Sequence, residues 1–204
     1  MCLRACRRSR ISSADASLFP VKDGFRRVFL GLPAPAGLQE AVLQSRSLYS
    51  GFPFRWTAPE HLHVTLVPPW QCPDIGPVCA VISETALRYP CFSVVFNSLS
   101  PGPSRRKPRL LWATAKAPLH LLQLRRELAL GFSAEADHDF FLHMTVARFR
   151  PEAVSGILPE PRIVFWPGTF DRICLYESLL YPSGAVYREL CSVRFVEASR
   201  GRGN

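Results

Sequence analysis

The sequence predicts a single α+β domain built on an antiparallel sheet, and three observations lead to that fold class. The chain has 204 residues, a length within the range of one domain. Hydrophobic residues make up 48% of it and charged residues 20%, the balance of a globular protein and not of a disordered one. Strand-like and helix-like apolar periods are mixed without a strict strand-helix-strand repeat, which favours antiparallel pairing.

Three strands and two helices are expected in the first half of the ordered chain. The strands are short apolar or alternating runs bounded by prolines, and the helices place their apolar residues on one face. These elements cover residues 27–32 (strand), 36–49 (helix), 54–57 (strand), 62–67 (strand) and 76–88 (helix). Pro68 and Pro69 indicate a turn that ends the third strand.

The second half is expected to hold five strands and the clearest helix of the chain. Residues 92–99 and 109–116 are predicted to pair as a hairpin around the loop 101–107. Residues 118–131 are predicted to form the helix, because leucines recur there at helical spacing between Arg and Glu. The remaining strands are expected at 142–149, 169–177 and 186–196.

The charge balance is strongly basic. Lys and Arg number 25 against 16 Asp and Glu, so the net charge of +9 produces a field that attracts polyanions. RNA or a nucleotide is one partner class that fits, and a basic surface that only aids solubility is the other; composition leaves both open. Arg105, Arg106, Lys107 and Arg109 lie in or beside the hairpin loop, where they could contact an RNA backbone or face solvent.

Nothing in the sequence indicates a membrane-spanning or secreted protein. No apolar run approaches the ~20 residues needed to cross a bilayer, and no apolar signal core stands at the N-terminus. We therefore expect a cytoplasmic protein, and we expect it to be a monomer. Its seven cysteines, an odd number without a Cys-x-x-Cys pair, are expected to be reduced thiols. Residues 1–25 are predicted to be a flexible basic arm and 198–204 a flexible tail. The arm also fits an organelle transit peptide or a translation start placed upstream.

One tetrapeptide pattern occurs twice, each time within an alternating run. His63-Val64-Thr65-Leu66 is matched 80 residues later by His143-Met144-Thr145-Val146. Side chains at i and i+2 of a strand share a face, so each His lies beside its Thr while the residue between them faces the core. A single copy is weak evidence, but two copies arise by chance in roughly 1% of chains with this His and Thr content.

Two such strands suit the hydrolysis of a cyclic phosphate. Water must lose a proton as it attacks phosphorus, and the leaving ribose oxygen must gain one on the opposite side. Imidazole, with an ordinary pKa near ~6.5, can serve as the base in one position and as the acid in the other. Thr65 and Thr145 would donate hydrogen bonds to the non-bridging oxygens. No metal is required, although His61, His63 and His143 leave a zinc site as an alternative.

With these motifs the chain resembles the two-histidine phosphoesterase superfamily, and within it the RNA 2′,3′-cyclic phosphodiesterases, also called 2′-5′ RNA ligases. The resemblance covers residues 27–196. It rests on both His-x-Thr strands and on the segments 27–33, 55–62, 141–148 and 175–178. The chain departs from the family at 67–70, where Val-Pro-Pro-Trp stands in place of a Phe-Leu-Gly stretch.

The resemblance implies a bilobal fold over residues 26–197, with two small antiparallel sheets, backed by helices, that face one another across a cleft. It implies that His63 donates a proton to the leaving oxygen and that His143 accepts one from water, without a cofactor. The substrate would be the 2′,3′-cyclic phosphate of an RNA end or a nucleotide, hydrolysed to a 2′-phosphomonoester. Arg148 would bind phosphate only if its strand bulges or ends there, because in a regular strand it faces away from His143.

Two other functions fit the same residues. A non-catalytic RNA-binding protein would keep the fold and a basic cleft without turning over a cyclic phosphate. An enzyme for 2′-5′-linked oligonucleotides, or for a small cyclic-phosphate metabolite, would keep the chemistry and change the substrate. The sequence leaves these alternatives open.

Overall fold

The computed structural model of the chain describes residues 24–104, 106–132, 140–150, 158–181 and 184–197. The expected N-terminal arm lies outside these ranges except for its last two residues, and the expected tail at 198–204 lies outside them entirely. The five cysteines within the ranges are free thiols. No helix there is long and apolar enough to cross a bilayer.

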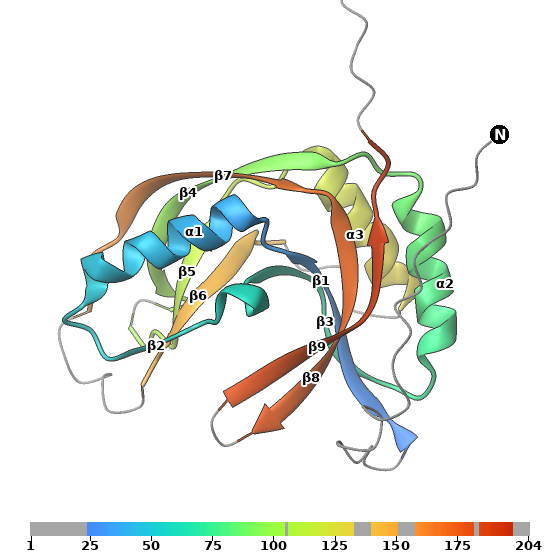
Figure 1. The fold of residues 1–204 in the computed structure, drawn as a ribbon, viewed down its shortest axis with the longest axis horizontal. Coiled ribbons are helices and arrows are strands. Elements are labelled where there is room, and N and C mark those ends of the chain that lie inside the picture. Colours follow the sequence, from blue (N-terminus) through green and yellow to red (C-terminus); the bar gives the residue numbers. More distant parts are fainter. Residues whose placement is uncertain (1–23, 105, 133–139, 151–157, 182–183, 198–204) are drawn as a thin grey trace, which may run out of the picture.

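Nine strands of the described chain pair antiparallel in one curled sheet (Figure 1). They are β1 (Arg26–Pro33), β2 (Phe54–Trp56), β3 (His63–Cys72), β4 (Phe92–Gly102), β5 (Leu110–Thr114), β6 (His143–Phe149), β7 (Arg162–Phe170), β8 (Arg172–Tyr181) and β9 (Gly184–Arg194). Their order across the sheet is β7-β4-β5-β6-β3-β1-β8-β9, and β2 pairs with β6 beside this path. An antiparallel sheet with interspersed helices confirms the predicted α+β class.

The sheet consists of two similar halves joined at its centre. The two His-x-Thr strands, β3 and β6, are neighbours there, and their register pairs Val64 with Met144. Outward from this junction, one half continues through β1, β8 and β9, and the other through β5, β4 and β7. This order confirms the two-lobed arrangement, with one motif strand at the inner edge of each lobe.

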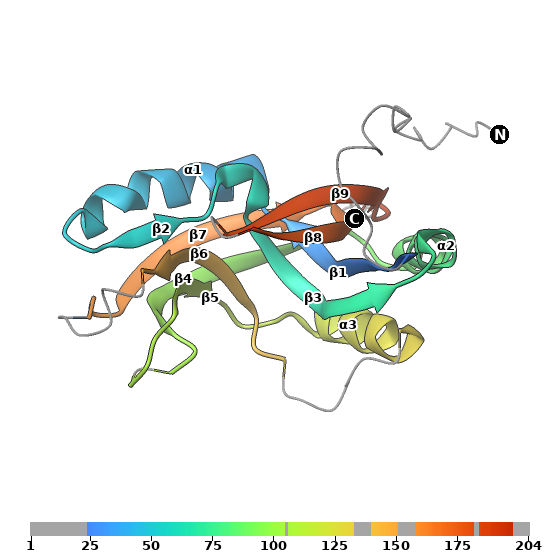
Figure 2. The same cartoon turned by 90° about the horizontal axis from the view of Figure 1, so that it is seen from below.

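Three α-helices of the described chain, α1 (Ala36–Ser45), α2 (Ile75–Ala86) and α3 (Leu119–Gly131), pack against the sheet. α1 follows β1 in the chain but packs against β7 of the other lobe, and α3 follows β5 but packs against β3. α2 contacts β8, β9 and α3, and Figure 2 shows α2 and α3 together at one end of the molecule with α1 at the other. Each lobe is thus covered by a helix that follows a strand of the other lobe.

The helices bury apolar stripes against the sheet. Leu38 of α1 and Leu121, Leu124 and Leu128 of α3 are each 1% exposed or less. Helical spacing of three and four residues brings such side chains to one face. α1 approaches β7 so closely that a Cβ added at Gly168 would lie 2.5 Å from Cδ1 of Leu38. The absence of a side chain at Gly168 permits this approach.

Some predictions about the elements were wrong. Pro68 and Pro69 do not end the third strand: β3 continues to Cys72, because both prolines lie at a register shift against β1, where the ladder is already interrupted. The predicted strand at 169–177 contains only the last two residues of β7 and continues into β8, so most of β7, including Pro167, is missing from the prediction. β7 is the edge of the sheet, where proline is tolerated. The end of the predicted helix 36–49 is a separate 3-10 turn, η3 (Arg46–Tyr49).

Candidate active site

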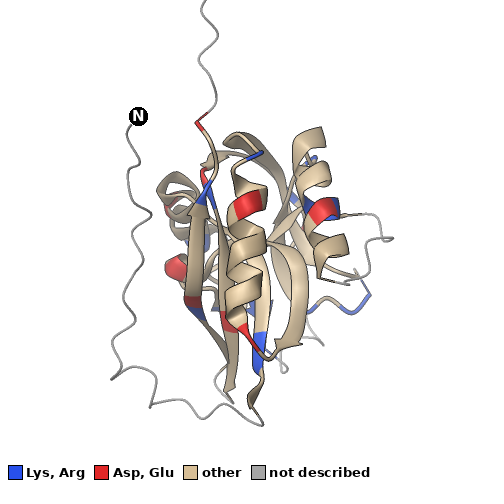
Figure 3. Cartoon of the chain, turned by 90° about the vertical axis from the view of Figure 1, so that its right-hand side faces the viewer, with Lys and Arg blue, Asp and Glu red and all other residues tan. Residues whose placement is uncertain are grey.

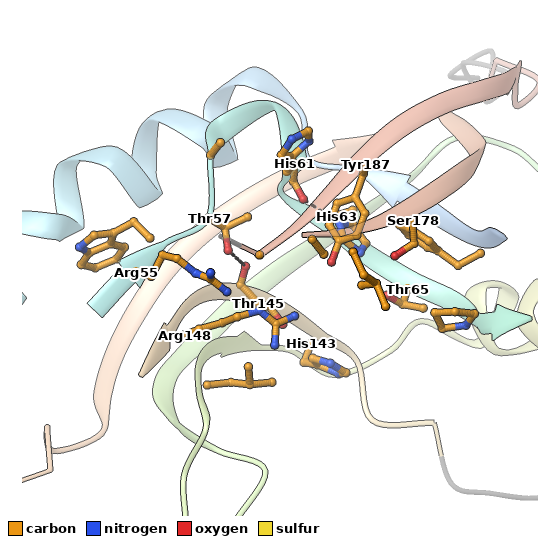
Figure 4. Close-up of a pocket in the computed structure, with 18 of the residues that line it drawn as sticks. Arg55, Thr57, His61, His63, Thr65, His143, Thr145, Arg148, Ser178 and Tyr187 are labelled. Atoms are coloured by element: carbon orange, nitrogen blue, oxygen red, sulfur yellow. Dashed lines mark hydrogen bonds between the residues drawn. The ribbon is translucent and has the colours of Figure 1, made fainter. Parts of the chain in front are cut away.

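The register of the central strands places the two motifs across from one another. Val64 and Met144, the pair that joins β3 to β6, are both fully buried. In an antiparallel pair the flanking residues also face each other, so each imidazole lies across from the threonine of the other motif. These side chains point away from the core, into a cavity that they share (Figure 4). They are His63, Thr65, His143 and Thr145.

Each motif strand bulges immediately after its threonine. The extra residue is Leu66 on β3 and Val146 on β6, where the register with β1 and with β5 shifts. Val146 and Ala147 are consequently both buried, which breaks the alternation of β6. A bulge moves every later side chain of the strand to the other face. Arg148 therefore lines the same cavity as His143, because the bulge that it needs in order to face the site is present.

Both imidazoles are held by the same kind of contact. Nδ1 of His63 lies 2.7 Å from the carbonyl oxygen of His61, and Nδ1 of His143 lies 2.9 Å from that of Phe141. A carbonyl oxygen only accepts, so Nδ1 carries the proton and donates it in both rings. Nε2 of each neutral ring is then unprotonated. Each ring can accept a proton there, or donate one once it is doubly protonated.

Aromatic side chains enclose His63. Its ring centroid lies 4.9 Å from that of Phe29, 6.0 Å from that of Tyr176 and 5.1 Å from that of Tyr187. This burial lowers the pKa of His63 to about 4; the hydrogen bond from its ring to the backbone opposes the shift, and nearby positive groups reinforce it. His63 is therefore neutral at pH 7 in the ligand-free protein. His143 packs instead against Trp112, at 4.8 Å between ring centroids.

The cavity is cationic and has a volume of about 470 Å³. Among the described residues, no Asp or Glu lines it, whereas acidic and basic residues are interspersed on the face of the molecule seen in Figure 3. Such a lining favours an anion. Its basic side chains are Arg27, Arg55, Arg148, His61, His63 and His143.

Two further residues of the cavity wall come from β2 and the segment after it. Thr57 donates hydrogen bonds from Oγ1 to the carbonyl of Thr145 at 3.1 Å and from its backbone N–H to that of Val146 at 2.9 Å. It thereby supports the β6 bulge. Arg55 lies opposite Arg148 in the register of β2 with β6. Its guanidinium also approaches β9: a Cβ added at Gly184, where φ is +130°, would lie 2.6 Å from Nη1 of Arg55.

Sequence reasoning missed these residues, together with Phe29 and Tyr187, because no motif marks them. Two signals could have indicated part of the wall: the alternating run Arg55-Trp56-Thr57 just before the first motif, and the segment 27–33 of the family resemblance, which contains Phe29. His61 also lines the cavity, with its ring 5.5 Å from that of Tyr187. Within the described residues, no three His, Cys, Asp or Glu side chains are grouped to hold a metal ion, so the zinc alternative gains no support.

A two-lobed antiparallel sheet that presents one His-x-Thr strand from each lobe to a common cavity defines a two-histidine phosphoesterase fold. Two named proteins are similar to this chain in sequence. The RNA 2′,3′-cyclic phosphodiesterase of Thermotoga maritima is 23% identical over 166 residues, 77% of this chain and 88% of that protein. The Bacillus subtilis protein of the same name is 29% identical over 128 residues, 59% of this chain and 69% of its own length.

Structural similarity gives the same fold. The crystal structure of the Thermus thermophilus protein TT0787 superimposes with a TM-score of 0.72 at 22% identity, over 84% of this chain and 98% of that one. The family model of the 2′-5′ RNA ligase superfamily matches residues 35–179, well over half of the chain. The chain therefore belongs to the 2′-5′ RNA ligase superfamily.

Proposed function

We propose that the protein hydrolyses the 2′,3′-cyclic phosphate at the end of an RNA, or on a nucleotide, and leaves the phosphate on the 2′ oxygen. Membership in the superfamily and the two relatives named RNA 2′,3′-cyclic phosphodiesterase support this activity. One observation carries the proposal: the two imidazoles are anchored alike. Nδ1 of each ring donates a hydrogen bond to a backbone carbonyl. Both Nε2 atoms are therefore available in the cavity that the rings share.

In the proposed reaction, water attacks phosphorus and the bond from phosphorus to O3′ breaks. Nε2 of His143 accepts the proton that water loses, and Nε2 of His63 donates a proton to O3′ as it leaves. The products are a 2′-phosphomonoester and a free 3′ hydroxyl. Exchange with solvent returns both rings to their starting protonation. Each transfer is typically worth ~10²- to 10⁴-fold in rate.

The remaining groups stabilise negative charge on the non-bridging oxygens. Thr65 and Thr145 donate from their hydroxyls, and the strands hold these donors in place before the reaction begins. Arg148 offers paired N–H donors that match phosphate oxygens. Side chains of this chain carry every step of the proposed reaction, and no cofactor takes part.

The depressed pKa of His63 bears on the direction of proton transfer. A donor must hold a proton, yet His63 is neutral at pH 7 in the free protein. A phosphate between the rings brings a negative charge into contact with the imidazole, which favours its protonated form. We therefore propose that His63 takes up its proton as the anionic substrate binds, whereas His143 acts in its neutral form.

Product analysis with a 2′,3′-cyclic mononucleotide, with and without a chelator, tests the activity. We expect a 2′-phosphate and no loss of rate on chelation; a 3′-phosphate would reassign the leaving oxygen, and loss on chelation would replace the mechanism with a metal site. His63→Ala and His143→Ala should each lower kcat by ~10²- to 10⁴-fold. His120→Ala, on α3 and outside the cavity, is the control.

Adding a cyclic-ended RNA and a 2′-5′-linked dinucleotide to the same assay separates the alternative functions. RNA binding by the wild-type protein without turnover of any substrate would indicate a non-catalytic RNA-binding protein. Hydrolysis of a 2′-5′-linked dinucleotide alone would indicate the other enzyme.

A 4-nitrophenyl phosphodiester tests which imidazole is the acid. The 4-nitrophenolate ion is a stable anion and leaves without a proton, so an acid is not needed for this substrate. His63→Ala should then lose little activity, whereas His143→Ala should lose the whole contribution of the base. The opposite pattern would exchange the two roles.

A further inference from the structure

The cavity extends past the two histidines to a second basic position, formed by Arg27 of β1 and Ser178 of β8. The register of β1 with β3 pairs Gly31 with Thr65, so four residues, about 13 Å of strand, separate Arg27 from the motif. Arg148 lies toward the other end. Figure 4 shows Arg148 and Ser178 on opposite sides of the site, with both imidazoles between them.

Arg27 and Ser178 are already held together. Nη1 of Arg27 donates a hydrogen bond to Oγ of Ser178 at 2.7 Å, and Ser178 is only 5% exposed. Because the hydroxyl oxygen accepts this bond, its own proton can be given to another acceptor. A guanidinium and a hydroxyl that converge in this way offer several donors to phosphate oxygens.

On the opposite face of β1 and β8, a carboxylate neutralises the nearby arginines. There, Arg26 and Arg188 both form ion pairs with the buried carboxylate of Glu177. On the cavity face the adjacent position of β8 is Ser178, a neutral side chain, and no carboxylate of the described chain lines the cavity. The charge of Arg27 is therefore directed at a space that contains no protein anion among these residues.

We propose that Arg27 and Ser178 bind the internucleotide phosphate next to the cyclic end of an RNA. The site would then take a cyclic-ended oligonucleotide in preference to a cyclic mononucleotide. The inference rests on the proposed hydrolysis, in which the cyclic phosphate lies between His63 and His143. Four residues of strand separate Arg27 from the first motif, so the Arg27–Ser178 pair lies beside the position of the cyclic phosphate and not at it.

The test compares kcat/KM for a cyclic-ended dinucleotide with kcat/KM for the cyclic mononucleotide of the same terminal base. Wild type should prefer the dinucleotide. Arg27→Gln should lower the ratio by roughly tenfold, the usual effect of losing one charge-assisted hydrogen bond, and Ser178→Ala should lower it less. Arg126→Gln, an exposed position on α3, makes the same charge change outside the cavity and should keep the wild-type ratio.

Salt dependence provides a second readout. The logarithm of kcat/KM should fall more steeply with the logarithm of salt concentration for the dinucleotide than for the mononucleotide, by about 0.7, the value for one phosphate of a single strand. Arg27→Gln should remove that difference.

An unchanged ratio in Arg27→Gln, or an equal loss in Arg126→Gln, would overturn the assignment. So would loss of the dinucleotide preference in Arg55→Gln alone, which would place the second phosphate at the other end of the cavity. If the mononucleotide is hydrolysed without any preference for the dinucleotide, the proposed function stands and this inference fails. If neither is hydrolysed, the proposed function fails and this inference with it.

Discussion

Lowering the pH from 7.5 to 5.0 should destabilise the wild-type protein by about 2 kcal/mol more than it destabilises His63→Gln. Burial lowers the pKa of His63 from 6.5 to about 4 in the folded state. Between those values the unfolded chain binds the proton and the folded protein does not. The free energy of unfolding therefore falls as the pH drops through this window, and the loss approaches about 3 kcal/mol at pH 4.

Urea unfolding, followed by tryptophan fluorescence at pH 7.5, 6.5 and 5.0, measures this effect. Other groups also titrate, so the informative quantity is the difference between wild type and His63→Gln at each pH. Parallel stability curves for the two proteins would refute the argument that His63 is held neutral by burial. An NMR titration of the His63 ring provides an independent check, and added inorganic phosphate should raise the pKa that it reports.

Three substitutions test other features of the structure. Arg148→Gln should lower kcat/KM for a cyclic phosphate by about 10- to 100-fold with partial recovery in Arg148→Lys, and an unchanged rate would remove this residue from the site. Gly168→Ala should lower the free energy of unfolding by about 1–3 kcal/mol without changing kcat, because its Cβ would overlap the fully buried Leu38. Gly102→Ala should lower kcat, because a Cβ there would overlap the Trp112 ring that packs on His143; unchanged kcat together with unchanged tryptophan fluorescence would contradict this.

The two motif strands could be predicted from the sequence because their evidence is local. Alternation alone places His63 and Thr65 on one face, and the same holds for His143 and Thr145. The mixture of periods was also sufficient for the α+β class, and most helices and strands lie within a few residues of their predicted positions.

The rest of the cavity depends on pairing between distant strands, which no single segment records. Arg148 reaches the cavity because β6 bulges at Val146, and that bulge is a property of the register with β5. Tyr187 meets His63 because β9 pairs with β8, which in turn pairs with β1. Pro167 shows the same limit: proline argues against a strand in general, and only the position of β7 at the sheet edge makes it acceptable.

The junction of β3 and β6 has a consequence for the direction of the chemistry. An antiparallel pair such as Val64 and Met144 has a local dyad, and this dyad exchanges the two imidazoles. In-line displacement at phosphorus has the same symmetry, because the entering and departing oxygens occupy opposite apices. By microscopic reversibility, groups that assist the departure of an alcohol also assist its attack. The strands themselves thus serve attack and departure alike, and only the surroundings of each ring, Trp112 at His143 and Phe29 and Tyr187 at His63, distinguish the two sides of the phosphorus.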